Sequence, residues 1–184
     1  MESWDIYDKH RCPLGKIKER GTRLEDGEYH LTAHICIFDR EGRMLIQQRA
    51  DCKSTWPSLW DVTAAGSVLA GESSEQGAHR ELFEELGLDR DFTNIRPHFT
   101  LNYDGGFGDY YLLVEDEVNL SELCLQKSEV KAVKYATLAE IEELLSKEQF
   151  IPYHHSFVSL LFDIKEECTS YIKDLAEKLK SKNI

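Results

Sequence analysis

The stretch GSVLAGESSEQGAHRELFEELGL, residues 66–88, decides the fold because it holds a full set of helix signals behind a glycine-rich loop. Ser73 and Gln76 have the spacing of a capping box, in which each side chain bonds the other residue's backbone N–H. Gly87 is placed to end the helix, since glycine tolerates the left-handed conformation found there. Apolar residues recur every four positions and predict a buried stripe: Ala78, Leu82 and Leu86. We therefore expect a loop followed by an amphipathic helix.

Three glutamates, Glu81, Glu84 and Glu85, lie within five residues of this helix in a chain that is already acidic. Like charges three or four residues apart destabilise a helix. Their side chains project within roughly 100° of one another, so three oxygen ligands share one ridge. Mg²⁺ and Mn²⁺ favour such ligands. The ridge is either a metal site or a solvated acidic face.

Composition limits the class of protein. The chain has 184 residues, which suits one domain spanning 1–184. Its net charge is −12, from 22 basic and 34 acidic residues, which argues against a broad nucleic-acid-binding surface. No segment has the apolar length of a membrane span or the core of a signal peptide, so we expect a cytoplasmic protein. The five cysteines form no CxxC pair, which disfavours a zinc site or a disulfide framework.

The rest of the chain predicts a mixed α/β fold, with a mixed sheet between helices. Residues 4–8 and 14–18 read as an N-terminal hairpin. Further strands are expected at 28–39, 44–49, 98–103, 109–118 and 130–135, with the DGGFG segment as a turn before 109. A helix is expected at 137–146. A long amphipathic helix is expected after Pro152, with apolar residues at helical spacing from Phe157 to Leu179.

The spacing in residues 66–88 is G-x5-E-x7-R-E-L-x-E-E-x-G-L, which matches every fixed position of the Nudix box. The chain thus resembles the Nudix hydrolase superfamily. The resemblance implies an α/β/α sandwich whose loop–helix–loop binds Mg²⁺ or Mn²⁺. It implies hydrolysis of a small-molecule diphosphate substrate, a nucleoside diphosphate linked to another group or a similar organic pyrophosphate. It does not identify that group or the residues that bind it.

The resemblance also assigns roles by position. Glu81, Glu84 and Glu85 would be metal ligands, one of which would instead serve as the base, and Gly66 would offer its backbone carbonyl. Two residues would be an orienting pair that holds the carboxylates in place: Glu72 and Arg80. Glu129, six residues before an aromatic, would be a further metal-binding or basic glutamate. It also reads as an exposed loop carboxylate.

This chemistry suits a pyrophosphate, whose charge repels an attacking hydroxide. Divalent ions offset that charge, deprotonate a water molecule and hold the attack in line. A nearby glutamate that accepts the proton typically contributes about 10²–10⁴-fold. No cysteine, serine or lysine nucleophile is needed.

Residues 4–90 resemble the branch that contains isopentenyl-diphosphate isomerase, with departures that matter. The isomerase has its catalytic cysteine where this chain has Ala65 and a metal-binding histidine where it has Ser67. His30 matches one of two N-terminal metal-binding histidines, and Arg23 stands at the other. His30 also reads as a packing residue of a strand. Trp56 and Trp60 resemble family aromatics that pack in the core.

We therefore expect a hydrolase. The alternatives left open are an isopentenyl-diphosphate isomerase and a non-catalytic protein of the same fold that senses a nucleotide or a metal.

Overall fold

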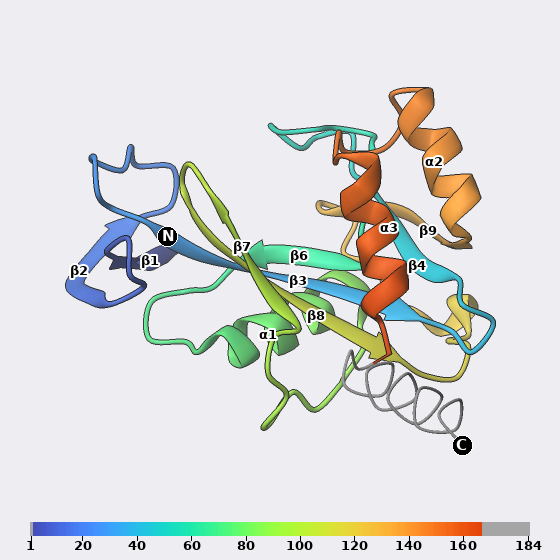
Figure 1. Ribbon diagram of the computed structural model, residues 1–184, viewed down its shortest axis with the longest axis horizontal. Helices are drawn as coiled ribbons and strands as arrows, with labels where there is room; N and C mark the ends of the chain where they lie inside the picture. Colours follow the sequence, from blue (N-terminus) through green and yellow to red (C-terminus); the bar gives the residue numbers. More distant parts are fainter. Residues whose placement is uncertain (1, 167–184) are drawn as a thin grey trace, which may run out of the picture.

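The computed structural model describes residues 2–166 of the chain (Figure 1). The strands are β1 (Ser3–Tyr7), β2 (Pro13–Glu19), β3 (His30–Phe38), β4 (Met44–Arg49), β5 (Trp60–Asp61), β6 (Ala64–Ser67), β7 (Phe99–Tyr103), β8 (Gly106–Val114) and β9 (Val130–Ala136). The helices are α1 (Ser74–Leu86), α2 (Leu138–Ser146) and α3 (His155–Ile164), with a 3-10 turn η1 (Leu120–Glu122). No helix of this part of the chain is long and apolar enough to cross a membrane.

Seven strands form one mixed sheet. The order β5-β4-β3-β8-β7 gives its main path, with β6 paired to β3 and β9 paired to β4. β3 and β8 run parallel, and the other neighbours are antiparallel. β6 pairs with Thr32–Ile35 of β3, whereas β4 pairs with Ile37 and Phe38. The sheet therefore forks along β3, with β6 beside its first half and β4 beside its end.

Two hydrophobic clusters cover the opposite faces of the sheet. Alternate residues of β3 point to each face, as the pleat requires. One set packs with α1: Leu31, Ala33, Ile35 and Ile37. The other set, Cys36 and Phe38, packs with α2 and α3. This arrangement is an α/β/α sandwich, so the expected fold class is confirmed (Figure 1).

Helix α1 forms as its sequence predicts. Ser73 and Gln76 make both bonds of the capping box, and Gly87 takes φ 72° at the C-terminal end. Ala78, Leu82 and Leu86 are all fully buried against the sheet.

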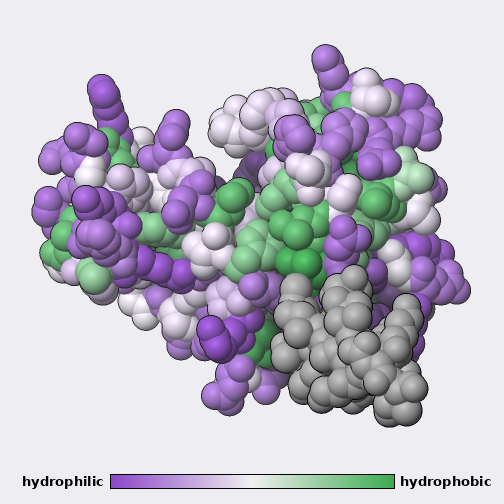
Figure 2. All heavy atoms as spheres, in the orientation of Figure 1, coloured by the Kyte–Doolittle hydropathy of each residue, from purple (hydrophilic) through white to green (hydrophobic). Residues whose placement is uncertain are grey.

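The N-terminal hairpin is a separate two-stranded sheet of β1 and β2, as expected. A bridge between Tyr7 and Tyr29 joins it to the start of β3. Arg11 in its turn forms an ion pair with the buried Asp109 of β8. Figure 2 shows hydrophilic residues over the hairpin and hydrophobic residues gathered over the sheet beside α3.

Several boundaries differ from the expectation. β8 begins at Gly106, inside the DGGFG segment, because its pairing with β3 extends it toward the N-terminus. It ends at Val114, before the expected residue 118. Two short strands, β5 and β6, were not predicted. Trp56 is 51% exposed and does not pack in the core. α3 ends at Ile164, and the later positions of the expected C-terminal helix, Cys168 to Leu179, lie outside the described residues.

Candidate active site

Two adjoining cavities lie where β6 leads into the loop before α1. The smaller, of about 90 Å³, contains the glutamates of α1, and we call it the carboxylate recess. It is lined by Glu2, Arg20, Arg49, Lys53, Ala65, Gly66, Glu81, Glu84, Glu85, Gln126 and Glu129. The recess thus gathers five glutamates and three cations from segments far apart in the sequence.

Gly66 lies against the carboxyl group of Glu81. A Cβ atom on Gly66 would lie 2.1–2.3 Å from that carboxyl group. The carboxylate thus occupies the space that a side chain at residue 66 would need. Any other residue at this position would require the end of the Glu81 side chain to move.

Glu85 is the most buried glutamate of the recess, at 4% exposed. Its Oε2 accepts hydrogen bonds from Gln47 Nε2 at 2.9 Å and from the backbone N of Ala65 at 3.3 Å. Neither donor carries a charge. Burial, and then the negative charge of Glu81, raise the pKa of Glu85 to about 8. This carboxyl group lacks a compensating cation among the described residues.

Arg80 ties the glutamates together. Its Nε and Nη2 donate to the two carboxylate oxygens of Glu72 at 2.8 and 3.0 Å, and Nη2 also donates to the carbonyl of Ser67 at 2.8 Å. Its Nη1 donates to Glu81 at 2.8 Å and to Glu84 at 3.2 Å. Although burial alone would raise the pKa of Glu72, the contact with Arg80 lowers it. Arg80 therefore joins Glu72 to the carboxyl groups of Glu81 and Glu84.

The remaining acidic residues stand at the edges of the recess. Glu84 is about half exposed. Glu129 lines the recess with the glutamates of α1 and forms an ion pair with Lys53. Glu2 pairs with Arg20 at 2.5 Å. The structure therefore brings the predicted residue Glu129 to the same place as Glu81, Glu84 and Glu85, and Glu129 is not a free loop carboxylate.

The recess has the composition of a site for Mg²⁺ or Mn²⁺. Its acidic donors are all carboxylate oxygens, Glu85 is buried without a counter-charge, and Gly66 leaves its backbone open toward Glu81. As the side chains lie, no three acidic, histidine or cysteine residues of the described chain converge on one point. Arg80 holds Glu81 and Glu84, and Gln47 holds Glu85. The carboxylate oxygens are of the type that Mg²⁺ and Mn²⁺ prefer, and rotation of the side chains would be needed to bring these oxygens together.

The cations of the recess were missed from the sequence. Arg20, Arg49 and Lys53 come from the end of the hairpin, from β4 and from the loop after it. Arg49 is held in place because its Nε and Nη2 donate to the carbonyl of Thr55 at 3.2 and 3.1 Å. In a chain with 22 basic residues, no local signal separates these three from the others.

The larger cavity, of about 470 Å³, opens beside the recess, and we call it the aromatic cavity. Arg20, Arg49, Ala65 and Gly66 line both, so the two are continuous. The other residues that line it are Thr32, His34, Thr55, Trp56, Asp61, Ser67, Leu101, Tyr103, Gly108, Tyr110, Ile151 and Tyr153. They come from β3, β5, β6, β7, β8 and the loops beside β5 and α3.

Two polar residues of the aromatic cavity are deeply buried. Burial raises the pKa of Asp61 to about 6, and Tyr153 OH donates to its Oδ1 at 3.1 Å. Burial lowers the pKa of His34 to about 4, and the ring stacks on Tyr110 with centroids 4.4 Å apart. His30, by contrast, stacks on Trp4 at 4.2 Å and lines neither cavity, which agrees with its reading as a packing residue.

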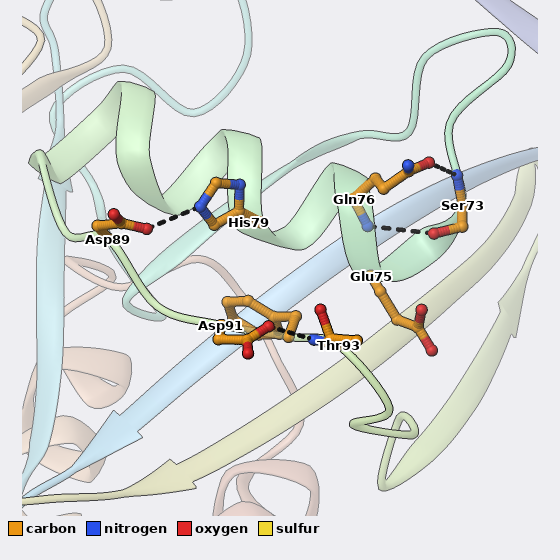
Figure 3. Close-up of a pocket in the computed structure, with 8 residues that line it drawn as sticks. Ser73, Glu75, Gln76, His79, Asp89, Asp91 and Thr93 are labelled. Carbon is orange, nitrogen blue, oxygen red and sulfur yellow. Dashed lines mark hydrogen bonds and ion pairs between the residues drawn. The ribbon is translucent and has the colours of Figure 1, made fainter.

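A third hollow, of about 620 Å³, lies along α1 and the loop after it and contains none of the predicted site residues (Figure 3). Most of its polar side chains bond one another or the local backbone. The capping box joins Ser73 and Gln76, and His79 Nε2 lies 2.9 Å from Asp89 Oδ1. It therefore adds nothing to the candidate active site.

Comparison with known proteins finds relatives of this chain. Residues 28–159 match the NUDIX domain family. An uncharacterized Nudix hydrolase of Listeria monocytogenes is 44% identical, over 92% of this chain and 98% of the relative. An isopentenyl-diphosphate delta-isomerase of Schizosaccharomyces pombe is 32% identical, over 79% of this chain and 74% of the relative. A crystal structure of a Deinococcus radiodurans protein superposes with a TM-score of 0.68 at 17% identity, covering 87% of this chain and 97% of that one, which shows a shared fold.

Proposed function

This chain belongs to the Nudix family, and from that premise we propose that it is a metal-dependent hydrolase of diphosphate linkages. Its substrate is a nucleoside diphosphate derivative or a similar organic pyrophosphate, and water attacks phosphorus. The single observation that carries this proposal is the carboxylate recess, where five glutamates and three cations line one small space. Carboxylates suit a divalent metal, and arginine and lysine suit phosphate oxygens.

Glu81, Glu84, Glu85 and the backbone carbonyl of Gly66 would hold Mg²⁺ or Mn²⁺. When bound, the metal would offset the charge of the diphosphate and lower the pKa of a water molecule. The chain's own residues do the rest. Arg80 and Glu72 keep the glutamates of α1 in position, and positioning of this kind typically contributes 10- to 100-fold to metal affinity or activity.

The cations of the recess would bind the phosphates. Arg49 lines both cavities: its Nε and Nη2 donate to the carbonyl of Thr55, and its Nη1 forms a 3.8 Å ion pair with Asp61 Oδ2. Arg20 and Lys53 line the recess beside it. A glutamate of the recess then accepts the proton of the attacking water, and Glu129 and Glu85 are the candidates for that base.

The relationship to isomerases favours a second candidate, isomerisation of isopentenyl diphosphate. That reaction adds a proton to one carbon and removes one from another. Ala65, which stands in place of the isomerase's cysteine, has no titratable group. No cysteine of the described chain lines either cavity, because Cys36 is buried in the core and Cys52 lies at the surface beside Ser128. Hydrolysis requires of residue 65 only a small side chain.

Incubation with a panel of diphosphates and Mg²⁺ or Mn²⁺, with identification of the products, tests this proposal. We expect phosphate or nucleoside monophosphate from at least one nucleoside diphosphate derivative and no allylic isomer from isopentenyl diphosphate. Dimethylallyl diphosphate formed at a catalytic rate would establish the isomerase instead. Tight binding of a nucleotide or metal without any product would establish a sensor.

A further inference from the structure

Hydrolysis of a diphosphate does not specify which organic group the aromatic cavity receives. The inference here rests on the proposed function. A diphosphate held in the carboxylate recess lies beside the aromatic cavity, because Gly66, Arg20 and Arg49 line both. The organic group attached to one phosphate therefore enters the aromatic cavity.

Asp61 is the acidic residue in the wall of this cavity, which aromatic residues, Arg20, Arg49 and hydroxyl side chains also line. It is only 3% exposed, so it is removed from bulk water. Its Oδ1 accepts hydrogen bonds from the backbone N of Val62 at 2.8 Å and from Tyr153 OH at 3.1 Å. Its Oδ2 has no hydrogen bond within the described residues, but it forms an ion pair with Arg49 Nη1 at 3.8 Å.

An oxygen of this kind discriminates strongly between ligands. A hydrocarbon group that filled the cavity would leave Oδ2 dehydrated and without a hydrogen-bond donor, with only the 3.8 Å ion pair to Arg49 to offset its charge, which is costly for a buried carboxylate. A group that brings an N–H or O–H would replace the lost water. Sites built to bond a polar group reject analogues that lack it far more strongly than apolar pockets reject a missing methylene.

We propose that Asp61 is a specificity-determining residue, whose Oδ2 accepts a hydrogen bond from an amino or hydroxyl group on the organic part of the diphosphate substrate. The side chains around it describe the rest of that group. Trp56 is half exposed and Tyr103 lines the cavity, whereas the ring of Tyr110 is already stacked on both His34 and Phe99. Exposed aromatic side chains such as Trp56 favour a flat, ring-shaped body beside them. The substrate class is thus a diphosphate ester of a planar group that carries a hydrogen-bond donor.

Two matched substrate pairs test the inference with the full chain and Mg²⁺ or Mn²⁺. The first pair is adenosine diphosphoribose and the analogue whose adenine amino group is replaced by hydrogen. The second is isopentenyl diphosphate and its hydroxylated derivative. We expect kcat/KM to favour the donor-bearing member of at least one pair by on the order of 10²-fold. A ratio near one in both pairs would overturn the role of Asp61 and leave the proposed hydrolase intact.

Asp61→Asn sharpens the test, because the amide keeps an oxygen for Val62 and Tyr153 and turns Oδ2 into a donor. We expect the preference to collapse by at least tenfold. A preference that survives in the folded variant would overturn the inference.

If Asp61→Asn does not fold, Trp56→Leu should raise KM several-fold for the ring-bearing substrate without changing kcat. An unchanged KM would count against entry of the ring.

If none of the four compounds is hydrolysed, the proposed function fails for them. Calorimetric titration with their non-hydrolysable methylene diphosphonates then tests Asp61 separately. Tighter binding of the donor-bearing member supports the inference, and equal binding overturns it.

Discussion

Two buried glutamates, Glu28 and Glu85, have opposite surroundings. They are 5% and 4% exposed. Glu28 accepts from Lys16 at 3.0 Å, from Lys18, and from the backbone N of Glu25 at 3.0 Å. Hydrogen bonding from Lys18, followed by that from the Glu25 backbone, lowers the pKa of Glu28 to about 2. Glu85 has two uncharged donors, and burial raises its pKa to about 8.

The difference separates a carboxylate that the chain itself neutralises from one that it does not. Glu28 joins the hairpin to the start of β3, and its partners belong to the same chain. Glu85 is buried at a cost that only an added cation or a proton relieves. Perturbed groups of the second kind cluster at functional sites. The comparison therefore supports a stabilising role for Glu28 and the proposed catalytic role of the carboxylate recess.

The largest effect should come from Glu84→Gln/Glu85→Gln. We expect hydrolysis to fall by roughly 10²–10⁴-fold and affinity for Mg²⁺ or Mn²⁺ to fall strongly, because two ligand charges are lost. Metal titration by calorimetry and assays of the substrate panel measure both.

Thermal unfolding in chelator supplies the control for that variant. The metal-free variant should be at least as stable as the wild type above pH 8, because the Glu85 carboxyl group, whose charged form burial disfavours, is replaced by a neutral amide. Unchanged metal affinity would contradict the assignment of these glutamates, and lower stability in chelator would contradict the comparison.

The next effect should come from Gly66→Ala. The new Cβ would overlap the carboxyl group of Glu81, so that side chain must move. A displacement of about 1 Å at such a site can lower activity by on the order of 10²-fold. Steady-state kinetics at saturating metal, with circular dichroism to confirm folding, measure this. Normal activity in a folded variant would show that the position of Glu81 is unimportant.

Arg80→Ala should follow, with activity lowered by roughly 10- to 100-fold. The guanidinium contacts Glu72, Glu81 and Glu84 through a fork that lysine cannot reproduce, so Arg80→Lys should restore little. Specific activity of the folded fraction is the measurement. If that value stays normal while the protein unfolds more readily, Arg80 has a structural role only.

The smallest effect on activity should come from Glu28→Gln, which should instead lower the midpoint of thermal unfolding by roughly 2–8 °C. The pKa of Glu28 is about 2 in the folded protein, against 4.5 for an unperturbed glutamate. The stabilisation of the folded state by Glu28 is therefore complete above pH 4.5 and is lost as the pH falls toward 2. The stability difference between wild type and variant should shrink over that window. A constant difference from pH 6 to pH 2.5 would contradict the role of Glu28.

The sequence by itself determined what depends on neighbours along the chain. Helix α1 was predictable because its capping box, buried stripe and terminal glycine are all local signals. Strands β3, β4 and β9 and the hairpin were recognised from short-range patterns for the same reason. The family motif placed Glu81, Glu84 and Glu85 on one helical ridge, which the spacing of a helix guarantees.

Only the tertiary structure decided what depends on contacts between distant segments. Pairing with β3 moved the start of β8 to Gly106, and residues of β3, β5, β6, β7 and β8 come together to line the aromatic cavity. Glu129 and the cations Arg20, Arg49 and Lys53 reach the recess from separate segments. The opposite environments of Glu28 and Glu85 follow in the same way. A glutamate's charge is stabilised by whatever surrounds it in space, and a one-dimensional pattern contains no record of those distances.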